Sequence, residues 1–201
     1  MRHARLRRSE LCAVELLCGQ GFSSIYDFLG MSVPRLKLPV SVIFDSFRSF
    51  CEKTGTNRAH FGAQGADALT VRHDGQYIIL YNEAIENEKR RAFTLAHEVG
   101  HILLSHAGEE PEVEEREANA FAASLLCPEI VFHYWEHRDG ISFDAERLAA
   151  TFSLSREAAA NRLRDLRRRE RRRPTDTEIT LLLCLFGRIP EEKNTDNAAS
   201  L

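Results

Sequence analysis

The apolar residues recur at helical spacing over most of the chain and alternate with polar residues in one stretch. Residues 68–82 hold two alternating runs around Asp74-Gly75, a pair typical of a two-residue type I′ hairpin turn. Apolar positions three or four residues apart predict helices over residues 9–18, 41–54, 90–106, 113–127 and 144–166. The pattern therefore predicts an α+β chain with a small antiparallel sheet.

Capping residues mark the ends of the first two predicted helices. Ser9 is placed to cap the first, while Ser41 is placed to cap the second and Gly55 to end it. Residues 56–67 are expected to form a loop. The apolar spacing of residues 178–186 fits a strand and a helix equally well.

These elements fall into four predicted regions. A helical arm and linker are expected over residues 1–38, and a core with the hairpin over 39–140. A helix pair packed on that core is expected over 141–173, and an apolar segment with a polar tail over 174–201.

Composition places the chain among ordinary soluble proteins. At 201 residues, with 43% hydrophobic and 28% charged residues, it can build one core with appendages. The net charge of −3 excludes a global field that would attract nucleic acid. An odd number of cysteines without a CxxC spacing indicates reduced thiols, and no apolar run approaches the ~20 residues of a membrane helix. We therefore expect a cytoplasmic protein with no membrane partner.

The strongest chemical motif lies in residues 90–106. It places His97, Glu98 and His101 in the order H-E-x-x-H within a helical apolar pattern. Histidines four residues apart lie on one helical face and can bind a single metal ion. The glutamate can reach a water on that metal and act as general base. The alternative is a pair of buried histidines satisfied by hydrogen bonds.

A hydrolytic zinc site needs a third protein ligand and leaves a fourth position for water. The extended form H-E-x-x-H-x-x-G-x-x-H is excluded, because Leu104 and Ala107 replace its glycine and its last histidine. His106 lies about 500° around the helix from His101, so we expect it to point away from the metal, as a surface or C-terminal dipole residue. The third ligand must come from another element.

The predicted helix 113–127 offers the nearest acidic candidates. It is rich in alanine, so it can approach the metal helix closely where Gly100 thins the facing surface. Glu115 lies one turn before Ala118 on the inward face and is the expected ligand, whereas Glu117 lies about 200° around the helix. The alternative is that all of these glutamates form a solvated acidic face.

These two segments carry a resemblance to a known family. The motif H-E-x-x-H, followed by E-x-x-A-N-x-F-A and a leucine-rich run that ends in proline, resembles the ImmA/IrrE family of metallopeptidases over residues 39–165. The matching segments read AFTLAHEVGHILLSH and EREANAFAASLLCP. One departure is Cys127, which replaces the methionine common before the proline.

The resemblance implies a zincin-like minimal metallopeptidase fold of the glutamate-ligand type. It also implies Zn²⁺ held by His97, His101 and Glu115, with Glu98 as the catalytic acid and base. Members of the family are typically linked to mobile elements or stress responses, and several cleave or inactivate a helix-turn-helix repressor. The implied function is a zinc-dependent endopeptidase that hydrolyses a peptide bond in such a repressor. The sheet edge beside the metal helix would bind the substrate by strand addition.

A helix pair over residues 144–166, with Asp144 and Ser155 as predicted N-caps, resembles a DNA-binding helix-turn-helix. Residues that can contact bases or phosphates lie on its second helix, at Arg156, Asn161, Arg162 and Arg164. Six more arginines follow within residues 167–173. The preferred interpretation is a scaffold packed on the core, with the arginines as a solvated helix end.

Two other classes of function compete with the peptidase. One is a DNA-binding transcriptional regulator with a structural or vestigial zinc site, acting through residues 144–173. The other is a protein-binding adaptor that uses residues 1–30. An aromatic, histidine-bearing patch between His133 and His137 could contact a reacting oxyanion, but packing and surface exposure are the preferred interpretation.

Overall fold

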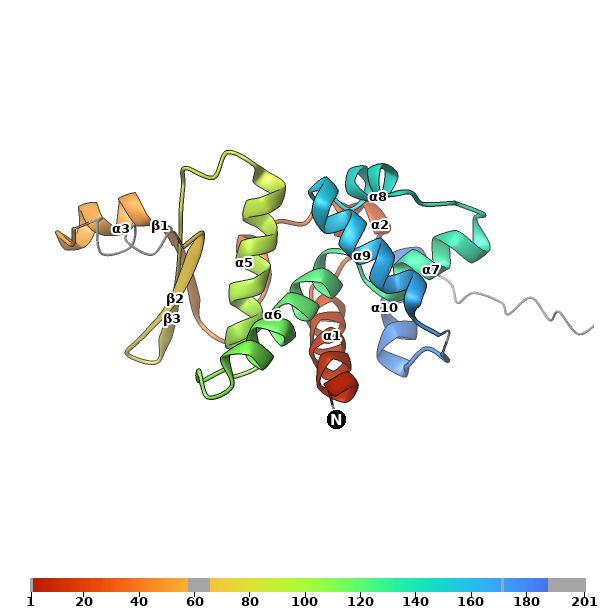
Figure 1. Ribbon diagram of the computed structural model, residues 1–201, viewed down its shortest axis with the longest axis horizontal. Helices are drawn as coiled ribbons and strands as arrows, with labels where there is room; N and C mark the ends of the chain where they lie inside the picture. Colours follow the sequence, from red (N-terminus) through yellow and green to blue (C-terminus); the bar gives the residue numbers. More distant parts are fainter. Residues whose placement is uncertain (1, 58–65, 171, 188–201) are drawn as a thin grey trace, which may run out of the picture.

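The computed structural model describes residues 2–57, 66–170 and 172–187, and these form an α+β structure. A small sheet lies toward one end of the molecule (Figure 1). Helix α5 (Glu88–Leu103) packs against this sheet and against α6 (Pro111–Leu126). Helix α1 (Arg2–Cys18) in turn packs against α6. Helix α5, which carries the H-E-x-x-H motif, therefore lies between the sheet and helix α6.

The sheet contains β1 (Val42–Ser46), β2 (Ala68–His73) and β3 (Gln76–Tyr81) in the order β1-β3-β2. The predicted hairpin is confirmed: β2 and β3 are antiparallel, and the turn residues Asp74 and Gly75 have φ values of 47° and 77°, as a type I′ turn requires. Strand β1 pairs with β3 in parallel, so the sheet is mixed. The prediction of an antiparallel sheet was wrong in this respect.

The missing strand lies inside the stretch predicted as one helix over residues 41–54. Residues 42–46 form β1, and the helix is the shorter α3 (Phe47–Thr54), with Ser46 as its N-cap in place of Ser41. Two β-branched residues begin this stretch, and the hydrogen bonds of a neighbouring strand decide its conformation. The predicted end is confirmed, because Gly55 caps α3 with a φ of 69°.

Helix α1 is longer than the predicted helix 9–18. Ser9 does not cap it but lies within it, where its hydroxyl donates to the backbone oxygen of Arg5 at 3.1 Å. The additional turns contain Arg7, which donates to Glu178 at 2.7 Å. A local sequence pattern cannot predict a contact with a residue so far along the chain. Leu17, only 1% exposed, shows that α1 contributes to the core.

The second half of the described chain is helical. The predicted caps Asp144 and Ser155 both accept from the backbone of the helices they begin, which confirms the helix pair. Residues 178–186 belong to a helix with a capping box between Thr175 and Glu178. The remaining elements are α2 (Ile25–Leu29), η1 (Val33–Arg35), α7 (Glu129–Arg138), α8 (Ala145–Thr151), α9 (Arg156–Arg168) and α10 (Asp176–Phe186).

A group of buried ion pairs, here called the ion cluster, joins α1, α7, α9 and α10. Its carboxylates are Glu10, Glu129 and Glu178, and its cations are Arg7, Arg162, Arg169 and Arg172. Arg162 is only 4% exposed, and it donates to the backbone oxygen of Cys127 at 2.9 and 3.1 Å. The cluster satisfies charges that are otherwise costly to bury.

Two predictions fall largely or wholly outside the described residues: most of the loop at 56–67 and the polar tail after residue 187. Among the helices of the described ranges, none has the length and apolarity needed to cross a membrane.

Candidate metal centre

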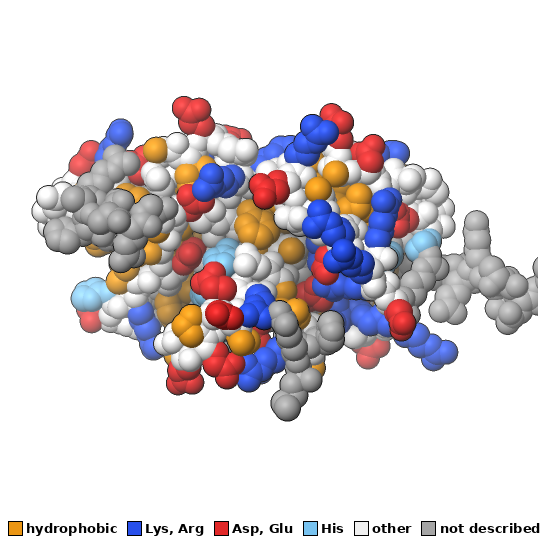
Figure 2. All heavy atoms as spheres, in the orientation of Figure 1, with side chains coloured by type: hydrophobic (Ala, Val, Ile, Leu, Met, Phe, Trp, Pro, Cys, Tyr) orange, Lys and Arg blue, Asp and Glu red, His pale blue; other side chains and the backbone are white. Residues whose placement is uncertain are grey.

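Helices α5 and α6 approach each other closely at Gly100. A Cβ atom placed on Gly100 would lie 3.1–3.2 Å from side-chain atoms of Phe121 on α6, which is tighter than ordinary packing. Glycine at this position therefore allows the close approach that brings α6 beside the histidines of α5. Figure 2 shows histidine side chains at the surface over α5, next to acidic side chains.

The three predicted metal ligands converge at this contact. The Nε2 atoms of His97 and His101 lie 2.9 Å apart. Glu115 places Oε2 3.3 Å from Nε2 of His97 and Oε1 3.4 Å from Nε2 of His101. These residues form one of two groups in the described chain whose ligand atoms could share a metal ion.

The remaining ring nitrogen of His97 faces Asn119 on α6. Its Nδ1 lies 3.1 Å from Oδ1 of Asn119. Because an amide oxygen only accepts hydrogen bonds, this arrangement puts the proton of a neutral imidazole on Nδ1. Nε2 of His97 is then left as an acceptor that faces His101 and Glu115.

The remaining ring nitrogen of His101 faces His106. The two Nδ1 atoms lie 2.9 Å apart, and Nε2 of His106 lies 3.1 Å from Oε2 of Glu117. The Glu117 carboxylate accepts from Nε2 of His106, so Nδ1 of His106 accepts from Nδ1 of His101. Nε2 of His101 is then also an acceptor.

The expectation that His106 points away from the metal face was wrong. Its side chain is only 6% exposed and lies against His101. The angular argument assumed that the helix continues, but α5 ends at Leu103 and the chain reverses at Ser105, with a φ of 58°. The glutamate considered as an alternative ligand, Glu117, reaches His106 instead of the Nε2 pair.

The predicted general base lies between α5 and the sheet. Thr70 on β2 donates its hydroxyl hydrogen to Oε2 of Glu98 at 2.5 Å. Burial raises the pKa of Glu98, and the Thr70 hydrogen bond and the charge of His97 oppose that rise. The pKa of His101 is lowered, first by burial and second by the charge of His97. The lowered pKa favours the neutral ring.

Sequence reasoning missed four residues of this site: Thr70, His106, Glu117 as the partner of His106, and Asn119 as the partner of His97. Asn119 stands inside the E-x-x-A-N-x-F-A motif, so its position could have indicated a role. Thr70 carries no local signal, because its contact with Glu98 depends on how the hairpin packs against α5.

The chain matches a known protein family. The family model of the IrrE N-terminal-like domain, which describes peptidases, matches residues 51–164, more than half of the chain. The matched range includes the H-E-x-x-H motif and both Glu115 and Glu117 of α6. A search of curated proteins found no match. The chain therefore belongs to the IrrE N-terminal-like domain family of peptidases, as the resemblance of its two motifs predicted.

Proposed function

We propose that this protein is a zinc-dependent endopeptidase in which His97, His101 and Glu115 hold the metal and Glu98 is the catalytic acid and base. The observation that carries the proposal is the convergence of three acceptor groups: two imidazole Nε2 atoms and one carboxylate. Acceptors at such distances repel one another unless a cation lies between them.

The spacing of these atoms fits zinc. With zinc–ligand bonds of about 2.0–2.1 Å, a tetrahedral site places its ligand atoms roughly 3.3 Å apart. The distances of 2.9, 3.3 and 3.4 Å lie close to that value. Two histidines and one glutamate are also a ligand set of catalytic zinc, which leaves a fourth position open for water or substrate.

Zinc at this position would supply Lewis-acid chemistry, because it would lower the pKa of water toward about 7 and polarise a peptide carbonyl. Glu98 takes a proton from the attacking water on its carboxylate and then delivers that proton to the leaving nitrogen. The hydrogen bond from Thr70 fixes the orientation of the Glu98 carboxylate for these transfers.

Outer contacts orient the two ligand rings. Asn119 holds the ring of His97, while His106 and Glu117 hold the ring of His101, and both contacts direct Nε2 toward the metal position. Contacts of this kind fix the tautomer and raise the basicity of the ligand nitrogen.

The substrate proposed is an extended segment of a protein. Strand β2 is an edge strand of the described sheet, and it carries Thr70, the hydrogen-bond partner of Glu98. A segment added to this edge would run past the general base and gain main-chain hydrogen bonds. The family resemblance favours a helix-turn-helix repressor of a mobile element or stress regulon as the protein cleaved. The odd number of cysteines without a CxxC spacing favours a reaction in the cytoplasm.

The alternative of DNA binding through residues 144–173 has less support. Figure 2 shows Lys and Arg side chains gathered over the part of the surface where Figure 1 places α9. Arg162 is buried, however, and Arg169 donates to Glu10 and Glu129 at 2.8 and 3.1 Å. These contacts favour a structural role for the helix pair over DNA binding. We also propose a division into an arm with a linker, a core, this packed pair and an apolar segment with a tail, over residues 1–38, 39–140, 141–173 and 174–201.

The test is cleavage of a defined peptide library, read by mass spectrometry, with zinc-loaded wild type and Glu98→Gln. We expect cleavage to fall by about 10²–10⁴-fold in the variant while its zinc content stays at the wild-type level, because Glu98 moves protons and does not bind the metal. Equal cleavage by both proteins would contradict the role of Glu98. Absence of cleavage by the zinc-loaded wild type, on the library and on purified helix-turn-helix repressors, would contradict the peptidase proposal.

A further inference from the structure

A second group of metal-binding side chains lies on α7, away from the contact of α5 and α6. His133, Glu136 and His137 each place one ligand atom within 4.8 Å of the others. In the sequence they form the pattern H-x-x-E-H, which spaces the two histidines four residues apart on a helix. This pattern is the reverse of the motif on α5, and it is known as a zinc-binding motif in its own right.

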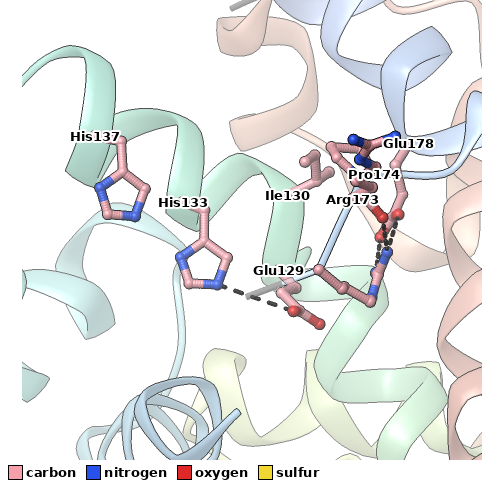
Figure 3. Close-up of a pocket in the computed structure, with 8 residues that line it drawn as sticks. Glu129, Ile130, His133, His137, Arg173, Pro174 and Glu178 are labelled. Carbon is pink, nitrogen blue, oxygen red and sulfur yellow. Dashed lines mark hydrogen bonds and ion pairs between the residues drawn. The ribbon is translucent and has the colours of Figure 1, made fainter. Parts of the chain in front are cut away.

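The two imidazoles lie side by side on one face of α7. Figure 3 shows His133 and His137 projecting from consecutive turns of the helix in the same direction. Their ring centroids are 5.6 Å apart, and the ring planes differ by only 16°. His137 is exposed, whereas His133 and Glu136 are half-buried, so a hydrated ion can reach His137 from solvent.

The inner side of this pair carries both carboxylates and guanidinium groups, because Glu129, Arg172 and Arg173 line the same cavity. A carboxylate oxygen of Glu129 lies 3.9 Å from Nε2 of His133 (Figure 3). Glu129 is held by the ion cluster, through Arg169 at 3.1 Å and Arg7 at 3.6 Å. Both histidines and Glu129 line one cavity of about 400 Å³. The usual outer contact of a metal-bound histidine is a hydrogen bond from its other ring N–H to a carboxylate, and Glu129 would have to approach from 3.9 Å to accept one.

We propose that His133, Glu136 and His137 form a second binding site for a divalent transition metal such as zinc. Imidazole and carboxylate are the ligand types that suit zinc, and one helix supplies all three. Binding requires the ligand atoms to close from as much as 4.8 Å to roughly 3.3 Å. Because these side chains must move and one is exposed, this site binds zinc more weakly than the centre between α5 and α6.

This inference concerns a site apart from the proposed peptidase centre, but its expected zinc count includes the ion proposed for that centre. It predicts that the full chain takes up two zinc ions, the second of which ties together two turns of α7. Both sites can be filled or lost independently, because they share no residue.

The test is calorimetric titration of Zn²⁺ into the full chain already loaded with one equivalent of zinc. Wild type should show a second binding event, and His137→Ala should weaken it by at least about tenfold, since even an outer contact contributes about 10–100-fold to metal affinity. The control is His73→Ala, which removes an exposed histidine of the hairpin and should leave the second event unchanged. His97→Ala, titrated from the metal-free state, should keep the weaker event and lose the tighter one.

Three outcomes would overturn the proposal. These are absence of a second event in wild type, an equal second event in His137→Ala, and an equal second event in Glu136→Gln, which would exclude the three-residue ligand set. His137 lies at the surface, so its substitution tests the site without endangering the fold, and circular dichroism checks that each variant is folded.

Discussion

The metal centre and the ion cluster both gather carboxylates with nitrogen-bearing side chains, yet they balance their charges differently. In the ion cluster, each buried carboxylate faces a guanidinium: Glu10 faces Arg162, and Glu178 faces Arg172 at 2.6 Å. At the metal centre, the carboxylate of Glu115 faces two imidazole nitrogens that are acceptors. The ion cluster is therefore balanced by its own side chains, whereas the proposed metal centre would take its cation from outside.

Exposure differs in the same sense. The side chain of Glu178 is 2% exposed, and that of Glu115 is 59% exposed. Buried ion pairs hold helices in place, because breaking one leaves an unpaired charge in the interior. An exposed ligand remains accessible to an ion and to a substrate. The difference teaches that similar residue types serve the fold in one region and chemistry in the other.

The largest expected effect on stability comes from breaking the ion cluster. Arg162→Met removes a cation 3.4 Å from Glu10 and leaves the oxygen of Cys127 without its guanidinium donor. We expect the free energy of unfolding to fall by about 1–3 kcal/mol in urea denaturation, because the buried oxygen of Cys127 loses its donor while Glu10 keeps Arg169 at 2.7 Å. The matched control on the same helix is Arg164→Met, which is exposed and should stay within about 0.5 kcal/mol of wild type. Equal effects of the two substitutions would mean that the cluster does not hold the helices.

A smaller effect, on metal affinity and not on folding, is expected from the outer contacts of the metal centre. His106→Ala removes the group that orients His101, so we expect zinc affinity to fall by about 10–100-fold in competition with a chelator. Urea denaturation of the metal-free protein should separate this effect from a loss of stability. Unchanged zinc affinity in His106→Ala would mean that His106 only packs against His101. The outer contacts of the proposed metal centre would then not serve metal binding.

Local signals predicted the elements that local chemistry determines. The H-E-x-x-H helix, the Asp74-Gly75 hairpin and the caps at Asp144 and Ser155 each depend on residues within a few positions of one another. The parallel strand β1 was missed because it is defined by pairing with β3, more than thirty residues later. A short apolar run has no spacing of its own that separates strand from helix.

The candidate site follows the same division. Glu115 could be chosen by its helical face, because the small residues of α6 indicated which side packs against α5. His106 was misplaced because its position depends on where α5 ends. The buried role of Arg162 was also invisible, since its carboxylate partner Glu10 lies 152 residues away in the sequence. The spacing of apolar residues can indicate which face of a helix is buried, but not which distant group contacts that face.

The central claim is that three acceptor groups at the contact of α5 and α6 hold one zinc ion, and zinc content tests it most directly. We would measure zinc per chain by mass spectrometry in three proteins: a His137→Ala reference, which weakens the second site, and that reference with Glu115→Gln or Glu112→Gln. Glu112 lies on the same helix but faces solvent and pairs only with Arg116 among the contacts described.

After dialysis against a weak chelator, we predict about one zinc in the reference and in Glu112→Gln, and much less in Glu115→Gln. Unchanged zinc in Glu115→Gln, or no zinc in the reference, would contradict the account.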